Sequence, residues 1–161
     1  MMKKSLYRFL LVAISSTLLH ASQEVVVDLS EQKAYALEDG SIVFEGRISS
    51  GMRGHETPEG EFTILQKKRH HVSNLWPKPK GGAVMPYMLR LNNDGIAMHL
   101  GAVPNRPASH GCIRLSNGFA QKMFAWARVG TTVVVEGDAG LYGKTSDDVY
   151  ADEYAVIDIH E

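Results

Sequence analysis

The stretch PASHGCIRLS, residues 107–116, holds the only cysteine of the 161-residue chain. A thiol becomes a useful nucleophile when a nearby base or positive charge favours its thiolate form. His110 lies two positions before Cys112, Arg114 lies two positions after it, and His99 lies further upstream. Each of these residues taken singly has a plain structural explanation. Together, within sixteen positions, they favour a thiol active site.

A lone cysteine also has two other interpretations. It cannot form an internal disulfide, and in an oxidising compartment a free thiol is a liability unless it is buried or used. An inert buried cysteine and an intermolecular disulfide therefore compete with a nucleophile. Composition alone favours the inert cysteine, because free Cys is among the most buried residue types. The neighbouring histidines and arginine change that balance.

The spacing of the two histidines separates their expected roles. Side chains at i and i−2 of a strand or turn share a side but seldom hydrogen-bond well. His99 is therefore the better base for Cys112, if the loop between them folds back, and His110 is the poorer one. Backbone N–H groups of Gly111 and Cys112 can point at a developing oxyanion. The planar guanidinium of Arg114 suits a carboxylate.

A zinc site is the alternative for the same side chains. His99, His110 and Cys112 are all zinc-capable types, and His70 and His71 are further candidates. The spacing H-x10-H-x-C is not typical of zinc sites, however, and no Asp or Glu lies nearby to orient the ligands. Because ligand type alone is a weak signal, we expect no metal and no cofactor.

The chain begins with the three-part pattern of a secretory signal peptide. The basic residues Lys3, Lys4 and Arg8 precede an apolar run at 9–19 and a small residue suited to cleavage. The run is shorter than the about 20 residues that span a bilayer, and an uncleaved anchor is the alternative. We expect a signal peptide at 1–21, a periplasmic or cell-envelope location, and no stable membrane span after cleavage.

The rest of the chain suits one domain with one core. Its formal net charge is −1, and its only basic cluster is KKRH at 67–70. No basic stripe with interleaved aromatics is present, so nucleic acid is not an expected partner. We expect the functional domain at 22–137. The acidic, turn-rich extension at 138–161 either adds an edge strand or stays mobile.

Most of the elements that must hold these residues are strands. Alternating and β-branched patterns predict strands at 24–29, 33–38, 42–49, 61–66, 87–91, 95–100 and 131–135. Two segments, DGS at 39–41 and NND at 92–94, are predicted turns. The fold class is therefore mostly β.

One helix is expected after the cysteine. Apolar residues between 119 and 127 recur at i, i+4, i+5 and i+8, which is one face of a helix. Ser116 or Asn117 can cap its start, and Gly130 lies just past its end. Upstream, the stretch 66–86 is expected to be a functional loop, because loops of that length in compact domains usually have a function.

The segment MHLGAVPNRPASHGCIRL resembles the signature of the L,D-transpeptidase catalytic domain, also called the YkuD domain. The family pattern is a histidine, a variable gap, then Ser/Thr-His-Gly-Cys, an apolar residue and Arg or Asn. It falls here on His99, 109–112, Ile113 and Arg114. The likeness covers roughly residues 24–136 and includes the family's TP-x-G-x-F segment, here Thr57, Pro58, Gly60 and Phe62.

The resemblance implies a β-sandwich with one helix following the catalytic cysteine, and a peptidoglycan L,D-transpeptidase. Cys112 would cleave the 3–4 bond of a stem tetrapeptide, release D-alanine and form a thioester acyl-enzyme. An amine of another stem would then give a 3→3 cross-link. His99 would carry the proton, backbone donors near Gly111 and Cys112 would hold the oxyanion, and Ser109 and His110 would shape the turn.

The same resemblance implies a substrate groove. Arg114 would support the site or bind a stem carboxylate. The loop that contains Trp76, Met85 and Tyr87 would line the groove. Such domains are acylated by carbapenems and use no metal.

Two departures from the family pattern carry expectations. The gap between His99 and Ser109 is short, so the lid over the site is expected to be small. Leu100 follows His99 where the family often has a small residue. A backbone carbonyl near Leu100 or Gly101 is therefore expected to orient the histidine.

Three alternatives stay open. An L,D-carboxypeptidase would use water as the acceptor, trim tetrapeptides to tripeptides and influence cell shape. A related transferase would link the wall to an outer-membrane protein. A non-catalytic wall-binding domain would carry a decayed site, against which the intact motif speaks.

Overall fold

The computed structural model describes residues 21–74 and 81–144. The predicted signal peptide, apart from its last residue, and most of the acidic extension lie outside this part of the chain. The described elements are β1 (Gln23–Asp28), β2 (Lys33–Glu38), β3 (Ser41–Ser49), β4 (Gly60–Thr63), β5 (Gln66–Lys68), β6 (Met88–Arg90), β7 (Ala97–Leu100), β8 (Ile113–Leu115), α1 (Phe119–Trp126), β9 (Thr132–Glu136) and a 3-10 helix, η1 (Ala139–Leu141).

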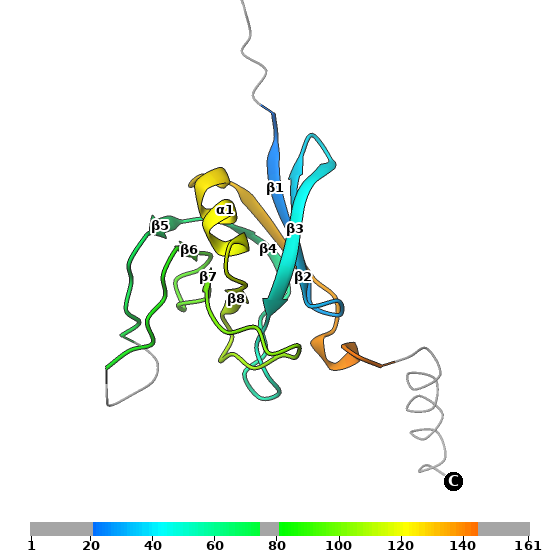
Figure 1. The fold of residues 1–161 in the computed structure, drawn as a ribbon, viewed down its shortest axis with the longest axis vertical. Coiled ribbons are helices and arrows are strands. Elements are labelled where there is room, and N and C mark those ends of the chain that lie inside the picture. Colours follow the sequence, from blue (N-terminus) through cyan, green and yellow to red (C-terminus); the bar gives the residue numbers. More distant parts are fainter. Residues whose placement is uncertain (1–20, 75–80, 145–161) are drawn as a thin grey trace, which may run out of the picture.

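The described strands form one hydrogen-bonded sheet in the order β4-β9-β1-β2-β3-β8-β7-β6-β5. β3 pairs with β2 along most of its length and with β8 only at Ile48 and Ser49. Because β3 belongs to both halves, the sheet curls so that the β1–β3 ribbon lies on one side and β6–β8 with α1 lie on the other (Figure 1). The mostly β sandwich with one helix after the cysteine is therefore confirmed.

The segment 61–66 differs from the prediction of one strand. It forms β4 and then β5, which lie at opposite edges of the sheet. The N–H of Ile64 donates to Thr131 O at 3.0 Å, and the N–H of Leu65 donates to Arg90 O at 2.8 Å. The curl thus brings the two edges together at residues 64 and 65, and the strand breaks there because its partner changes.

The core lies between the two halves of the curled sheet. Alternate residues of β1 point inward, so Val25 and Val27 are fully buried. They share one apolar cluster with residues of the other half and of α1, including Met98, Ile113 and Met123. This cluster supports β7 and β8 from behind.

The helix forms where its apolar period predicts, but its start differs. The N-cap is Gly118 with a φ of 79°, not Ser116 or Asn117. The N–H of Gly118 donates to Gln121 Oε1 at 2.7 Å, and Asn117 Oδ1 accepts from the Gln121 amide at 2.9 Å. The side chain of Gln121 therefore accepts the Gly118 N–H at the helix start, where we expected Ser116 or Asn117 to act as the cap. Among the described residues, no helix is long and apolar enough to cross a membrane.

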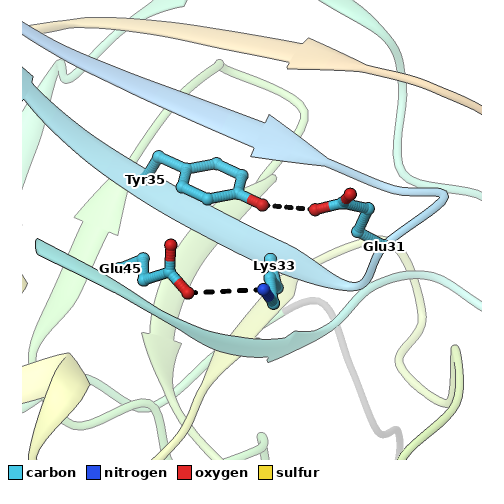
Figure 2. Close-up of polar contacts among 4 residues, drawn as sticks. All are labelled: Glu31, Lys33, Tyr35 and Glu45. Carbon is cyan, nitrogen blue, oxygen red and sulfur yellow. Dashed lines mark hydrogen bonds and ion pairs between the residues drawn. The ribbon is translucent and has the colours of Figure 1, made fainter. Parts of the chain in front are cut away.

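A group of polar side chains lies on β2, β3 and the turn before β2 (Figure 2). Lys33 Nζ lies 3.3 Å from Glu45 Oε1, and both side chains are more than two fifths exposed. The Tyr35 hydroxyl donates to Glu31, and this hydrogen bond raises the pKa of Tyr35. Exposed pairs of this kind contribute only about 0.2–1 kcal/mol. None of the four residues lines the candidate site, so we assign them no part in it.

One close approach fixes α1 against β3. A Cβ at Gly46 would lie 2.2 Å from the ring of Phe119. We expect Gly46→Ala to lower the free energy of unfolding by about 1–3 kcal/mol, because the ring must shift to make room. In a Phe119→Ala background the same change should cost far less, since the two sites are coupled. Urea unfolding of the four proteins measures this coupling.

Ile42→Ala is the matched control, because Ile42 is 58% exposed. It should change stability by no more than about 0.5 kcal/mol. Equal costs of Gly46→Ala in both backgrounds would show that Phe119 does not set this contact.

Candidate active site

β8 positions the cysteine, although no sequence pattern predicted this strand. It lies between β3 and β7, pairs in parallel with β7, and places Arg114 in register with His99. Cys112 directly precedes β8. The loop after β7 folds back as the choice of His99 required, and the N–H of Gly101 donates to Leu115 O at 3.1 Å. Two segments that are distant in the sequence therefore meet at one end of adjacent strands.

A cavity of about 280 Å³ opens at this place. Six of the residues singled out from the sequence line it, and Ser73 and Ala83 complete its wall. The lining residues that the sequence analysis named are Met85, His99, Ser109, His110, Cys112 and Arg114. The structure thus brings the thiol, both motif histidines and the arginine to one cavity.

His99 is held in one orientation from behind. Its Nδ1 lies 2.8 Å from the carbonyl oxygen of Leu100. Because a carbonyl only accepts, Nδ1 carries the proton, and Nε2 of the neutral ring is left with its lone pair. This is the backbone carbonyl that the sequence led us to expect. Burial lowers the pKa of His99, and Arg114 and His71 lower it further, against the opposing effect of the Leu100 bond.

Cys112 is partly buried, and its surroundings favour the protonated thiol. Burial raises the pKa of its thiol, while the backbone N–H of Ala97 and the charge of Arg114 lower it. The Sγ atom lies 3.6 Å from Gly95 O, to which the thiol donates. Both pKa shifts favour the uncharged forms, so a neutral thiol and a neutral imidazole line the same cavity.

The chain that leads into the cysteine is bonded to the continuation of β3. Ser50 O accepts from the N–H groups of Ala108 at 3.0 Å and Ser109 at 2.9 Å. The N–H of Met52 donates back to Ser109 O at 3.0 Å. The buried Ser109 hydroxyl donates to the carbonyl of Cys112. Ser109 therefore shapes the turn, as its place in the motif suggested.

The position before the cysteine requires glycine. Gly111 has a φ of 102°, and a Cβ there would lie 2.9 Å from Ile96 Cδ1.

The ring of His110 lies 4.6 Å from that of His55, centroid to centroid. Desolvation lowers the pKa of His110, and the nearby His55 and Arg114 lower it further.

The described parts of the segment 66–86, residues 66–74 and 81–86, pair with each other or with the sheet, where we predicted a loop. Its flanks form a ribbon, in which the N–H of Ser73 donates to Ala83 O at 2.9 Å and the N–H of Met85 donates to His71 O at 2.8 Å. Ser73 and Ala83 were missed as site residues. The Gly81-Gly82 pair was the available signal, because a Cβ at Gly82 would collide with the Ser73 carbonyl.

Tyr87, which we expected in the substrate groove, is not among the residues that line the cavity at Cys112. It has a left-handed φ of 55°, and its ring packs against Phe124 at 5.6 Å and below Arg69 at 5.5 Å. The Tyr87 side chain therefore packs against helix α1. The third residue expected in the groove, Trp76, lies outside the described residues.

The zinc interpretation has no support from a cluster of metal ligands in the described part of the chain. No group of three or more His, Cys, Asp or Glu side chains there is arranged to hold a metal ion. His70 and His71 do not line the cavity that holds Cys112.

Comparison with known proteins identifies a family and several solved structures with a similar fold. A family model described as the L,D-transpeptidase catalytic domain, YkuD, matches residues 22–135. An L,D-transpeptidase from Mycobacterium smegmatis is 25% identical with a TM-score of 0.66, over 72% of this chain and 59% of that one. One from Stackebrandtia nassauensis is 29% identical with a TM-score of 0.66, over 77% and 58%.

A third structure, the L,D-transpeptidase LdtMt1 in complex with imipenem, is 23% identical with a TM-score of 0.66, over 72% of this chain and 59% of that one. At that identity it shows the fold alone. The chain thus spans somewhat less than three fifths of the length of these relatives. No curated protein sequence matches it.

The pKa shifts of Cys112 and His99 predict how the alkylation rate of the Cys112 thiol depends on pH. Alkylation of Cys112 by iodoacetamide needs the thiolate, so its rate should rise with an inflection above the about 8.5 of a free cysteine. In Arg114→Gln the inflection should move to still higher pH, because the arginine charge lowers the pKa of the thiol. Arg128→Gln, outside the cavity, should leave it in place. Inflection of the wild type below the free-cysteine value would instead mean a resting thiolate–imidazolium pair.

Proposed function

The chain belongs to the L,D-transpeptidase catalytic domain family, whose model matches residues 22–135, and we propose that it is a peptidoglycan L,D-transpeptidase with Cys112 as its nucleophile. One observation carries the proposal. Cys112 and His99 line the same cavity, and the bond from His99 Nδ1 to Leu100 O leaves Nε2 as a base. That is the arrangement that an activated thiol requires.

Acylation moves one proton and exchanges one bond. His99 Nε2 takes the thiol proton as Sγ of Cys112 bonds to the carbonyl carbon between the third and fourth stem residues. The carbonyl π electrons move to oxygen and form an oxyanion, which backbone N–H groups at 111 and 112 stabilise. When the oxyanion collapses, the C–N bond breaks, and the D-alanine amine leaves with the proton from His99. A thioester remains on Cys112.

Deacylation reverses these roles with a new amine. The amine of a second stem attacks the thioester carbonyl and gives its proton to His99. The C–S bond breaks, and the sulfur recovers a proton from the imidazolium. The product is a 3→3 cross-link, and the enzyme returns to its neutral pair. Because a thioester also reacts with water, an L,D-carboxypeptidase is the alternative outcome, and a protein amine of the outer membrane is a third acceptor.

Arg114 serves the site electrostatically. It lies in register with His99 and lines the cavity. Its charge lowers the pKa values of both Cys112 and His99. The charge of Arg114 therefore favours the thiolate during the reaction. It also makes the His99 imidazolium a better proton donor. Its guanidinium also suits a stem carboxylate.

The proposed location and inhibitor class follow from the same chemistry. Peptidoglycan lies in the cell envelope, and the basic and apolar residues at 1–21 have the pattern of an export signal. We therefore place the enzyme in the periplasm or cell envelope. Since carbapenems acylate domains of the family to which this chain belongs, we also expect imipenem to acylate Cys112.

Product analysis tests the reaction. The protein is incubated with a purified disaccharide-tetrapeptide, with and without excess chelator, and products are followed by mass spectrometry. We expect a cross-linked dimer that lacks one D-alanine, unaffected by chelator. A tripeptide monomer would establish the carboxypeptidase instead. Unchanged tetrapeptide, together with a thiol that is inert to imipenem, would contradict the proposed function.

Substitutions test the two roles. Cys112→Ala should abolish turnover, because no other described side chain at the cavity can form the thioester. His99→Gln should slow acylation by imipenem about 10²–10⁴-fold, the usual contribution of a general base. Both variants should keep the thermal unfolding midpoint within a few degrees of the wild type. An active Cys112→Ala protein would refute the mechanism, and normal acylation of His99→Gln would make His110 the base.

A further inference from the structure

We propose that Thr57 is a positioning residue for the oxyanion: it holds the peptide unit between Gly111 and Cys112 so that the Cys112 N–H points at the developing negative charge. The inference rests on the proposed function, because it concerns the same acylation. It assigns a role to a buried threonine on the loop between β3 and β4, which neither carries the nucleophile nor lines its cavity.

Both hydrogen-bonding capacities of the Thr57 hydroxyl are used. Oγ1 accepts from the N–H of Gly51 at 2.8 Å and donates to the carbonyl of Gly111 at 2.8 Å. An N–H can only donate, so the hydroxyl proton is directed at Gly111. The side chain is only 5% exposed, and water therefore competes little for either bond.

The bond to Gly111 fixes more than a carbonyl. The carbonyl of residue 111 and the N–H of residue 112 belong to one planar trans peptide and point in opposite directions. With the oxygen held on the side of Thr57, the Cys112 N–H points to the opposite side. Thr57 lines a separate hollow with Arg53 and Glu56, whereas Cys112 lines the active-site cavity. Thr57 does not line the active-site cavity, so the N–H that points away from Thr57 is the one available to a substrate at Cys112.

This peptide needs such a restraint. Gly111 has a φ of 102° and no side chain, so the backbone can rotate there more freely than at any other residue type. The hydroxyl of Thr57 supplies a side-chain restraint on this unit, because it donates to Gly111 O at 2.8 Å. Ser109 does the corresponding task one peptide later, since its hydroxyl donates to Cys112 O. Two hydroxyls therefore hold the two peptides that flank the nucleophile.

The restraint is anchored in the sheet. Gly51 continues from β3 and forms an isolated parallel bridge with Ser109. A Cβ at Gly51 would lie 2.0 Å from His55 O. Thr57 can therefore approach Gly51 closely only because that position is glycine. A donor on a peptide carbonyl also polarises the unit and strengthens its N–H as a donor.

The test compares two reactions of the same thiol. Acylation by imipenem passes through an oxyanion, whereas alkylation by iodoacetamide displaces iodide at a methylene carbon and forms none. Thr57→Val keeps the size of the side chain and removes both hydrogen bonds. Thr57→Ser keeps the hydroxyl. Thr131→Val is the matched control, because Thr131 is equally buried, at 5% exposure, and its Oγ1 accepts from the Arg128 N–H at 3.0 Å.

We expect Thr57→Val to slow acylation about 10–100-fold, below the full loss of an oxyanion donor. Its alkylation rate and pH profile should stay those of the wild type. Thr57→Ser should restore most of the acylation, and Thr131→Val should change neither reaction. Rates are read from intact-protein mass spectra, with thermal unfolding to monitor the fold. Should Thr57→Val fail to fold, Thr57→Ala is measured in its place.

Three results would overturn the inference. Wild-type acylation in the Thr57 variants would show that the hydroxyl does not position the donor. Equal losses in acylation and alkylation would assign Thr57 a structural role only, because the thiol itself would then be displaced. A wild-type protein that is inert to both imipenem and the stem tetrapeptide would refute the proposed function, and this inference with it.

Discussion

The site depends on where β3 ends. Ile48 and Ser49 pair with β8, and the next residue, Ser50, binds the two N–H groups that lead into the cysteine motif. Ser50 is itself clamped by the buried Gln32, whose side-chain oxygen accepts the Ser50 N–H at 2.9 Å and whose amide donates to Ser50 Oγ at 2.8 Å. β3 also belongs to the other half of the sheet. The position of the nucleophile is therefore fixed relative to both halves.

Burial gives the site its electrostatic character. It raises the pKa of the Cys112 thiol and lowers that of His99, which favours the uncharged form of both groups. Arg114 shifts the cysteine the other way and stands opposite His99 in the parallel register. Charge therefore appears only during reaction, where fixed backbone dipoles rather than water must stabilise it. That requirement explains why so many hydrogen bonds converge on the peptides next to the cysteine.

Sequence patterns predicted the long elements well, because alternation and turn residues are local signals. β1, β2 and β3 and the face of α1 followed from them, as did the motif residues that meet in the cavity. β8 was missed because three residues carry no readable period. The strand predicted at 61–66 split because its partners change from β9 to β6, which no local pattern encodes.

Side-chain destinations were the least predictable feature. Tyr87 was expected in the groove, and its ring packs on Phe124 of α1 while its backbone lies in the left-handed region. The motif threonine was visible in the sequence, but its use was not. Its role depends on the meeting of residues 51, 57 and 111, which only the folded chain brings within hydrogen-bond distance.

The central claim is a covalent intermediate on one sulfur. The most direct measurement is brief incubation with a disaccharide-tetrapeptide, acid quenching, and tandem mass spectrometry of the digested protein. The account predicts a peptide around Cys112 that is heavier by the substrate less one D-alanine, and that loses this increment on treatment with hydroxylamine. Turnover with an unmodified Cys112, or an adduct on any other residue, would contradict it.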